Sequence, residues 1–299
     1  MIHTPVLPRE VIEILDPRPG ESILDVTVGL GGHASAFLRE IGLSGKFVGL
    51  DADEENLEEV RKVWKVRKVR NGTLIHANFR DLWELQLGAF DVIFADLGLS
   101  SPHLDELERG FTYSSDAPLD MRYDRTAGKT AADILNRASA VTLRDIFRDF
   151  GELREAAKLA KVVVSARRSK EMGRSADLRE VAVRVYGNRE MYFLSQIFQA
   201  LRIAVNDELG ALQAFLAEGP NMLVPGGRMG VMSYHSLEDR MVKQAFRDLT
   251  TPEKHPLTGA PLSPPLFELL TKKPIVSSEA EIAENPRSRS ARLRAIVKL

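Results

Sequence analysis

The chain has 299 residues and a formal net charge of −1, with 44% hydrophobic and 28% charged residues. These values are typical of a globular protein of about two domains. It contains no cysteine, which excludes disulfides, thiolate catalysis and zinc sites with cysteine ligands. No apolar run approaches the ~20 residues that span a bilayer, and the first residues do not resemble a signal peptide. We therefore expect a cytoplasmic protein with no membrane partner.

The first hundred residues alternate between strand and helix patterns. Such alternation favours an α/β fold in which helices cover both faces of a parallel sheet. Ligands of these sheets bind beyond the carboxyl ends of the strands. The predicted strands are Ser22–Val28, Lys46–Leu50, Thr73–Ala77 and Phe90–Ala95.

A glycine cluster, Gly29-Leu-Gly-Gly32, follows the first predicted strand. Glycines tolerate positive φ angles and let the backbone approach a ligand closely. The second strand is followed by Asp51, 22 residues after Gly29 and near the ~20-residue offset at which a carboxylate accepts ribose hydroxyls. The pattern indicates a cofactor that contains a nucleoside. The third glycine of G-x-G-x-x-G is absent, and a nicotinamide-dependent dehydrogenase is an alternative.

Strand patterns are absent for about a hundred residues after Leu104. Helices are predicted by apolar spacing, with Thr142 and Asp177 as caps at two of their N-termini. Apolar residues from Phe198 to Leu212 predict one long amphipathic helix that leads back to the α/β pattern. We expect a helical domain for substrate recognition, residues 105–205, inserted into a cofactor-binding domain, residues 1–104 and 206–299.

The α/β pattern resumes after this insertion. Residues Leu223–Arg228 predict a turn, Met229–Ser233 a strand, and Ser236 the cap of another helix. Two closing strands are predicted within Leu266–Val276 and Ala291–Leu299.

Polar side chains follow the predicted strands, where an α/β enzyme assembles its site. Phe79 could stack on an adenine, and Asp96 could orient a substrate donor; the alternatives are a core phenylalanine and a helix cap. A metal trio of His33, His103 and His235 lacks the spacing of known metal motifs, so no metal site is predicted. A serine hydrolase is disfavoured because no G-x-S-x-G elbow is present.

Three clusters of cationic residues interrupt the nearly neutral sequence. A phosphate-rich partner would use such clusters, but for any single cluster a solvated helix face is the favoured interpretation. A non-catalytic RNA-binding protein is therefore a second alternative. The clusters are Arg61, Lys62, Lys65, Arg67, Lys68 and Arg70; Arg167, Arg168, Lys170 and Arg174; and Arg287, Arg289, Arg292, Arg294 and Lys298.

Taken together, the motifs resemble one bacterial family, the ribosomal RNA small-subunit methyltransferase H or MraW family. The resemblance runs nearly from end to end, and the most specific motifs are Pro-Leu-Asp-Met-Arg and His-Ser-Leu-Glu-Asp-Arg in this order. The matching segments are His3–Leu7, Asp25–His33, Asp96–Pro102, Arg109–Phe111, Pro118–Arg122, Phe198–Ile203, Val205–Asn206 with Glu208–Leu209, Pro225–Arg228, His235–Arg240 and Glu284–Arg287.

The resemblance implies a Rossmann-like methyltransferase sheet with an inserted helical domain. It implies transfer of a methyl group from S-adenosylmethionine to N4 of a cytidine in the 16S ribosomal RNA of the small subunit, and a homodimer is left open. The cofactor contacts implied are Gly31, Gly32, His33, Asp51, Phe79, Asp96 and His103, with Asp96 also the candidate catalytic residue. Candidate substrate contacts are Ser100, Asp120, Arg122, Arg202, Asn206, His235 and Arg287.

Two departures from the family pattern are visible in the sequence. Relatives usually carry Gln at the position of His103, which still allows a polar contact. The segment before Phe198 is less polar and less basic here than in relatives.

Overall fold

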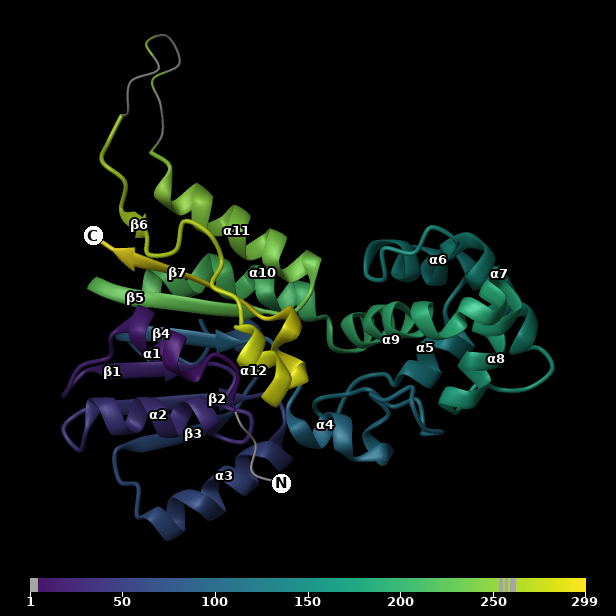
Figure 1. Cartoon of the computed structure of the whole chain (residues 1–299), viewed down its shortest axis with the longest axis horizontal. Helices are drawn as coiled ribbons and strands as arrows, with labels where there is room; N and C mark the ends of the chain where they lie inside the picture. Colours follow the sequence, from purple (N-terminus) through teal and green to yellow (C-terminus); the bar gives the residue numbers. More distant parts are fainter. Residues whose placement is uncertain (1–4, 253–254, 256–257, 259–261) are drawn as a thin grey trace. The chain divides into compact units, whose positions relative to one another are not determined.

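The computed structural model describes residues 5–252, 255, 258 and 262–299, so His3 and Thr4 of the first motif lie outside the described residues (Figure 1). The chain forms two compact units. Unit 1 consists of residues 1–98 and 210–299, and unit 2 of residues 99–209. Leu99 belongs to unit 2 because its side chain packs against the core of that unit.

A seven-stranded sheet forms the centre of unit 1 and confirms the predicted Rossmann-like α/β fold (Figure 1). In spatial order the strands are β3 (Gly72–His76), β2 (Lys46–Asp51), β1 (Ser22–Asp25), β4 (Phe90–Asp96), β5 (Leu223–Ser233), β7 (Arg292–Lys298) and β6 (Phe267–Leu269). Strands β1 to β5 are parallel to one another, and β7 runs antiparallel to both of its neighbours, β5 and β6.

The strand order reverses at the centre of this sheet. The chain continues from β1 to β2 and β3 on one side, and then returns to place β4 and β5 on the other side. The carboxyl ends of β1 and β4 therefore flank the switch point, which is where open parallel sheets bind their ligands.

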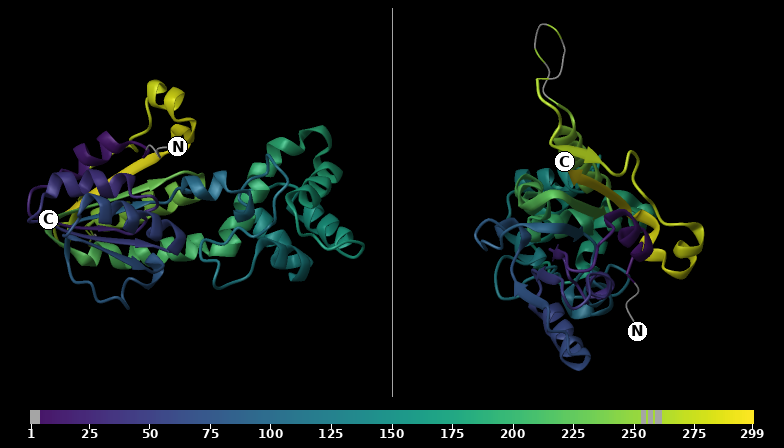
Figure 2. Two further views of the ribbon diagram at one scale, coloured as in Figure 1. Left: turned by 90° about the horizontal axis from the view of Figure 1, so that it is seen from below. Right: turned by 90° about the vertical axis from the view of Figure 1, so that its left-hand side faces the viewer.

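Helices cover both faces of the sheet because neighbouring strand residues point to opposite faces (Figure 2). Ile23 and Phe94 pack on one face, and Leu24 and Ala95 on the other. The first face packs against α1 (Pro8–Leu15), α2 (Gly32–Ile41) and α3 (Glu54–Arg67). The second packs against α10 (Glu208–Glu218), through Leu212 and Phe215, and α11 (Ser236–Thr250). A short helix, α12 (Glu279–Glu284), precedes β7.

A buried arginine ties the first helix to the middle of the sheet. The Arg228 guanidinium on β5 donates to both carboxylate oxygens of Glu21, at 2.8 and 2.9 Å, and to the carbonyl oxygens of Leu15 and Asp16 at the end of α1. The arginine of the Pro-Gly-Gly-Arg motif therefore has a structural role, because it joins β5 to the end of α1.

Unit 2 is helical and has its own hydrophobic core, with Phe147, Leu159, Leu178 and Leu201 among its fully buried members. Its helices are α4 (Ser101–Asp105), α5 (Ala131–Arg137), α6 (Ala140–Asp149), α7 (Ala156–Ala166), α8 (Ser175–Tyr186) and α9 (Glu190–Asn206). None of the described helices combines the length and hydropathy that a bilayer crossing requires.

The long helix predicted from Phe198 to Leu212 is two helices. Asp207 adopts a left-handed conformation, φ 48°, which ends α9 at Asn206, and α10 begins at Glu208. The amphipathic pattern continues across this break because both helices bury apolar faces, so periodicity could not reveal it.

Three predicted helix caps were wrong by one to three positions. The caps are Ser139 for α6, Arg174 for α8 and His235 for α11, instead of Thr142, Asp177 and Ser236. Asp177 still contributes, because its carboxylate accepts the backbone N–H of Arg174 from inside the first turn. Several polar residues stand near each helix start, and the local sequence does not rank them.

Strand boundaries differ modestly from the predictions. β1 ends at Asp25, earlier than predicted. The predicted turn Leu223–Arg228 is an irregular part of β5, where the register against β4 shifts and Gly226 has φ 78°. Of Leu266–Val276, only Phe267–Leu269 forms a strand, β6.

The packing of β2 gives a test of the sheet. A Cβ added at Gly49 would lie 2.4 Å from Cγ2 of Val28, a stiff branched side chain, so the strand must shift. We expect Gly49→Ala to lower the free energy of unfolding by about 1–3 kcal/mol. Urea denaturation measures the loss. Gly173→Ala, whose Cβ would meet nothing within 4 Å, is the control; equal stability of the two variants would contradict this packing.

Candidate active site

Three aspartates lie at the carboxyl edge of the sheet. Asp25 ends β1 and pairs in register with Gly49 of β2 and Phe94 of β4. Asp51 and Asp96 end those two strands, two residues further along. Parallel pairing therefore brings three carboxyl groups to the switch point, where they repel one another and favour a cationic ligand.

The glycine turn after β1 contacts the second of these aspartates. Gly29 and Gly31 have positive φ angles, 53° and 79°. The Gly29 N–H donates to Oδ2 of Asp51 at 2.7 Å, and the Asp53 N–H donates to Oδ1 at 2.8 Å. These two bonds hold the Asp51 carboxylate beside the glycine turn.

Gly31 and Gly32 begin α2 under tight packing. Gly31 is the N-cap residue, and Gly32 is the first residue of the helix. A Cβ at Gly31 would lie 3.3 Å from Val60, and one at Gly32 would lie 3.0 Å from Pro5. Both positions therefore favour glycine for the protein's own packing.

Asp25 lies at the candidate site but was not predicted as a site residue, because the sequence placed it within a strand. Its side chain is buried; Oδ1 accepts the Thr27 N–H at 3.0 Å, and Oδ2 has no hydrogen-bond partner. Burial raises the pKa of Asp25 to about 7, although the bond from Thr27 opposes the shift. An acidic residue inside an apolar strand pattern was the available signal in the sequence.

Asp96 is held by its backbone and faces a buried histidine. Its N–H donates to Oγ1 of Thr27 at 2.6 Å, and Oδ1 accepts the Gly98 N–H at 3.3 Å. Oδ2 lies 3.5 Å from Nε2 of His33, and that nitrogen makes no hydrogen bond. The His33 ring packs edge-on against Phe94, which fixes its position.

Tyr234, directly after β5, is a second residue that the sequence did not reveal. Its hydroxyl donates a hydrogen bond to the Asp96 carboxylate. Burial, together with the charge of Asp96, raises the pKa of Tyr234 well above its ordinary value, so the hydroxyl remains a donor at neutral pH. The ring lies against Gly98, where a Cβ would come within 2.7 Å of it.

Phe79 begins a short 3-10 helix, Phe79–Asp81, after β3. Its half-buried ring packs edge-on against Phe215 at 5.7 Å between centroids. Because β3 pairs with β2 so that His76 lies opposite Asp51, Phe79 also follows the carboxyl edge of the sheet.

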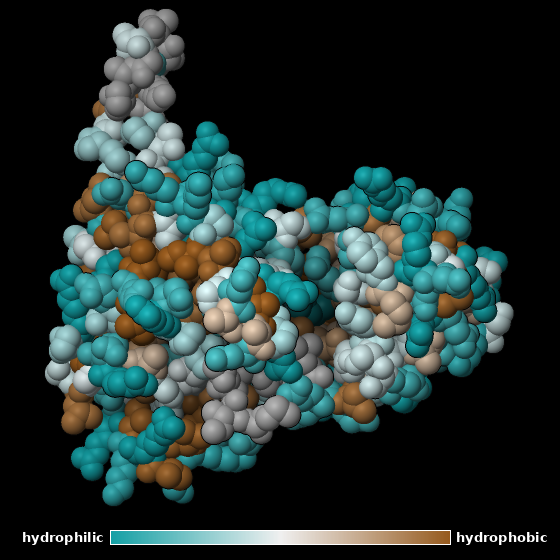
Figure 3. Space-filling model, in the orientation of Figure 1, coloured by the Kyte–Doolittle hydropathy of each residue, from teal (hydrophilic) through white to brown (hydrophobic). Residues whose placement is uncertain are grey.

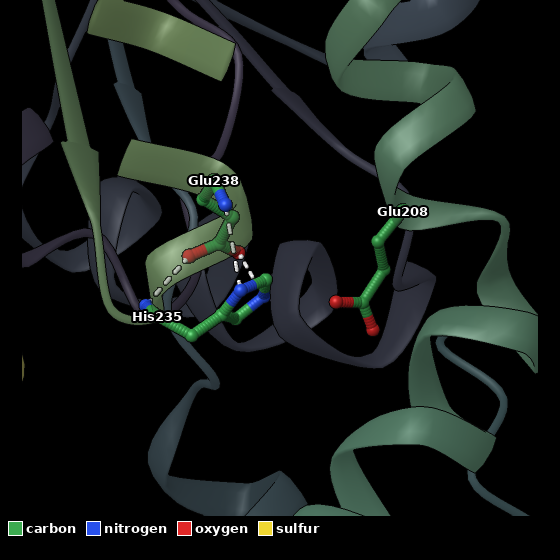
Figure 4. Close-up of side chains that lie close together, drawn as sticks. All are labelled: Glu208, His235 and Glu238. Carbon is green, nitrogen blue, oxygen red and sulfur yellow. Dashed lines mark hydrogen bonds and ion pairs between the residues drawn. The ribbon is translucent and has the colours of Figure 1, made fainter. Parts of the chain in front are cut away.

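His235, a candidate substrate contact, caps α11 (Figure 4). Nδ1 accepts the Glu238 N–H at 3.4 Å, and Oε2 of Glu238 accepts the N–H groups of Tyr234 and His235 at 2.8 and 3.2 Å. Nε2 lies 3.1 Å from Oε1 of Glu238. The pair fixes the chain just after β5, including the backbone of Tyr234. Arg287 is exposed in the segment Pro286–Ser290.

In unit 2, Ser100 and His103 belong to an aromatic cluster. Nδ1 of His103 accepts the Ser100 N–H at 3.3 Å, and the buried imidazole lies 4.9 Å from the ring of Phe111 and 5.1 Å from that of Tyr123. His33, His103 and His235 thus each contact a different polar group.

The other four predicted substrate residues of unit 2 form two networks. Arg122 makes a two-pronged ion pair with Asp120, at 2.8 and 2.9 Å, which lowers the pKa of Asp120 although burial opposes the shift. Arg202 pairs with Glu208, and Asn206 donates to the carbonyl of Met121 and accepts the N–H of Tyr123. Arg202 and Asn206 therefore belong to the network that holds the segment after Asp120.

Comparison with known proteins gives a consistent match along the chain. A sequence model of the MraW methylase family matches residues 1–299. Ribosomal RNA small subunit methyltransferase H of Syntrophotalea carbinolica is 44% identical over 310 residues, which cover 99% of this chain and 98% of the relative. The proteins of the same name from Symbiobacterium thermophilum and Nostoc punctiforme are 43% and 44% identical, over 99% of this chain and 96% and 94% of their own lengths.

The raised pKa of Asp25 makes the free energy of unfolding depend on pH. Comparison with Asp25→Asn isolates the contribution of this one residue. Its pKa is about 7 in the folded chain and 3.8 as the reference value, so the folded state holds the proton more tightly. This contribution is full below pH 4 and is lost as the pH rises to 7. Relative to Asp25→Asn, the wild type should lose up to about 4 kcal/mol over this range.

Urea denaturation between pH 4 and 8 measures this difference. Asp16→Asn, which changes an exposed carboxylate, should follow the wild-type pH dependence. Parallel curves for the wild type and Asp25→Asn would show that Asp25 is not protonated in the folded protein.

Proposed function

The chain belongs to the MraW methylase family, and we propose that it transfers a methyl group from S-adenosylmethionine to N4 of a cytidine in 16S ribosomal RNA. The substrate is the RNA of the small ribosomal subunit. The arrangement that supports this chemistry is the group of three carboxyl groups beside a glycine turn, because it suits a cationic cofactor that also carries a ribose.

The residues of the carboxyl edge fit this cofactor. Oδ2 of Asp25 and Nε2 of His33 are buried without hydrogen-bond partners, so a polar ligand can satisfy them. Asp51 accepts ribose hydroxyls, Phe79 contacts the adenine, and Gly31 and Gly32, which lack side chains, allow close approach of the cofactor. His103 is the proposed contact from unit 2. S-adenosylmethionine supplies a methyl group bonded to a positively charged sulfur.

Asp96 is the proposed catalytic residue. The lone pair of cytosine N4 is delocalised into the ring, which makes the amine a poor nucleophile. A carboxylate that accepts a hydrogen bond from N4 localises the lone pair, and it can take the proton that N4 releases after transfer. Asp96 suits this role because its backbone and its hydrogen bond from Tyr234 fix the carboxylate.

The target base must leave its stack to reach a site of this kind. Ser100, Asp120, Arg122, Arg202 and Asn206 of unit 2 are the proposed RNA-recognition residues. His235 and Arg287 are the proposed contacts from unit 1. Arg202 and Asn206 contribute through the backbone that they hold, since their side chains bind Glu208 and the segment Met121–Tyr123. Action on ribosomal RNA also favours a cytoplasmic location; a homodimer stays a prediction that the mass in solution tests.

The function is tested by the product it predicts. Purified protein, labelled S-adenosylmethionine and undermethylated small subunits should yield N4-methylcytidine in 16S RNA, detected by nucleoside mass spectrometry. Asp96→Ala should abolish transfer, because N4 loses its acceptor. Calorimetric titration should still show cofactor binding, weakened by the loss of one of its several contacts.

Two further binding measurements separate the alternatives. In calorimetric titration, binding of NAD in place of S-adenosylmethionine would favour a dehydrogenase. Binding of small subunits without formation of N4-methylcytidine would favour a non-catalytic RNA-binding protein. Near-normal methylation by Asp96→Ala would refute the role of Asp96 but leave the assignment of the reaction intact.

Tyr234 is a positioning residue for Asp96, and its hydroxyl can be removed without changing the ring. A hydrogen bond to a charged group contributes about 1.5–3 kcal/mol, so Tyr234→Phe should lower kcat about tenfold to a hundredfold. The KM for S-adenosylmethionine should stay unchanged, because the phenyl ring still packs on Gly98.

Tyr192→Phe is the matched control, since Tyr192 is 72% exposed. Wild-type kcat in Tyr234→Phe, or a loss confined to cofactor affinity, would contradict the positioning role.

A further inference from the structure

The three cationic clusters of the sequence differ in how the folded chain uses them. In the cluster at residues 167–174, Arg167 donates to the carbonyls of Leu135 and Ala138 at 2.7 and 2.8 Å. Lys170 and Arg174 form ion pairs with Asp177 and Asp116. Most of this cluster therefore serves the structure of unit 2.

The cluster near the end of the sequence is used in a similar way. Arg292 and Arg294 both pair with Asp239, at 3.2 and 2.7 Å, and Lys298 donates to the carbonyl of Leu223. These contacts join β7 to α11 and β5. Three of the five cations in this cluster thus have a structural role inside the protein.

The cluster on α3 is different. Arg61 and Lys62 pair with Glu54 and Glu59. The four cations that follow are all exposed, and within the described part of the chain they form no ion pair or side-chain hydrogen bond. We call this group the α3 basic surface; it consists of Lys65, Arg67, Lys68 and Arg70.

A hollow of about 390 Å³ adjoins this surface, and Lys65, Lys68 and Arg70 are among its lining residues. The Trp64 ring and Gly72 also line it and pack closely, since a Cβ at Gly72 would come within 2.4 Å of the ring. Figure 3 shows hydrophilic residues interspersed with apolar ones in this region. Unpaired, exposed cations around a hollow suit a polyanion whose phosphates approach from solvent.

The α3 basic surface is separate from the candidate active site. It lies at the C-terminal end of α3 and near Gly72, which begins β3, whereas the active site lies beyond the carboxyl ends of the strands. The 14 residues of α3 span about 21 Å. A partner that occupies both places must therefore carry phosphates on the order of 20 Å from the target base.

Helix electrostatics explain only part of the cluster. Cations in the last turn of a helix interact favourably with its dipole, which accounts for Lys65 and Arg67. Lys68 has a left-handed conformation after the helix, φ 56°, and Arg70 lies beyond it near β3. Interaction with the helix dipole therefore does not account for the exposed charges of Lys68 and Arg70.

We propose that the α3 basic surface binds backbone phosphates of folded 16S RNA at a distance from the target cytidine. This inference rests on the proposed function for the identity of the polyanion. Phosphate binding of this kind releases counterions and is sequence-independent, so it strengthens docking of the whole subunit without selecting the base.

The test is the triple variant Lys65→Gln, Lys68→Gln and Arg70→Gln, compared with Arg9→Gln, Arg18→Gln and Arg148→Gln. The control removes three exposed cations that each pair with an acid. At low salt the α3 variant should bind small subunits about tenfold more weakly, and the slope of log K against log salt should fall by about 3. The control should resemble the wild type.

Two further measurements show whether weaker subunit binding by the α3 variant comes from lost phosphate contacts or from damage to the active site or the fold. Cofactor affinity and methylation of a short oligonucleotide with the target cytidine should stay at wild-type values, because the active site is untouched. Unchanged subunit affinity in the α3 variant, or a change confined to its melting temperature, would overturn the proposal in favour of a helix-stabilising role. An equal loss with the short oligonucleotide would also overturn it. Absence of N4-methylcytidine with the wild type would instead refute the proposed reaction.

Discussion

The pairing of β1 between β2 and β4 is the constraint on which the site depends. It places Asp25, Asp51 and Asp96 at one edge of the sheet, and ionised carboxylates in such proximity repel. Hydrogen-bond donors to two of the carboxylates, and partial protonation of the third, limit this repulsion. Backbone N–H groups of the glycine turn and of Asp53 hold Asp51, and Tyr234 holds Asp96. Burial raises the pKa of Asp25 to about 7, so that a part of the molecules keeps this proton near neutral pH. A cationic ligand at this edge would relieve the remaining repulsion.

The family motifs divide into residues that line this edge and residues that support it. Gly31, His33 and Asp96 line it. Arg228 joins β5 to α1, and the His235–Glu238 pair fixes the backbone before α11. In unit 2, Asn206 supports the chain after Asp120 in the same manner. Charged or polar motif residues are thus as often buried scaffolding as ligand contacts, and unpaired exposed cations such as those of the α3 basic surface are the better guide to a polyanion.

Apolar runs were sufficient to place the first four strands, because buried parallel strands are short and nearly continuous in hydrophobic residues. Helix caps were predicted less well. Thr142, Asp177 and Ser236 are all acceptable caps locally, but the packing of each helix decides which residue precedes its first turn. The break at Asp207 was missed because a single left-handed residue leaves the amphipathic pattern on both sides intact. Asp25 was read as part of a strand, and Tyr234 had no local signal, since its partner Asp96 is far away in sequence.

The sequence by itself determined the fold class, the glycine turn and the aspartates that follow β2 and β4, because local periodicity and strand-end positions encode these features. It also carried the motifs that identify the family. Only the tertiary structure decided which polar groups are used internally. Ion pairs such as Arg294–Asp239, the hydrogen bond from Tyr234 to Asp96, and the raised pKa of Asp25 depend on burial and on distances between segments remote in sequence. Electrostatic environment is a property of the folded chain, and no local pattern specifies it.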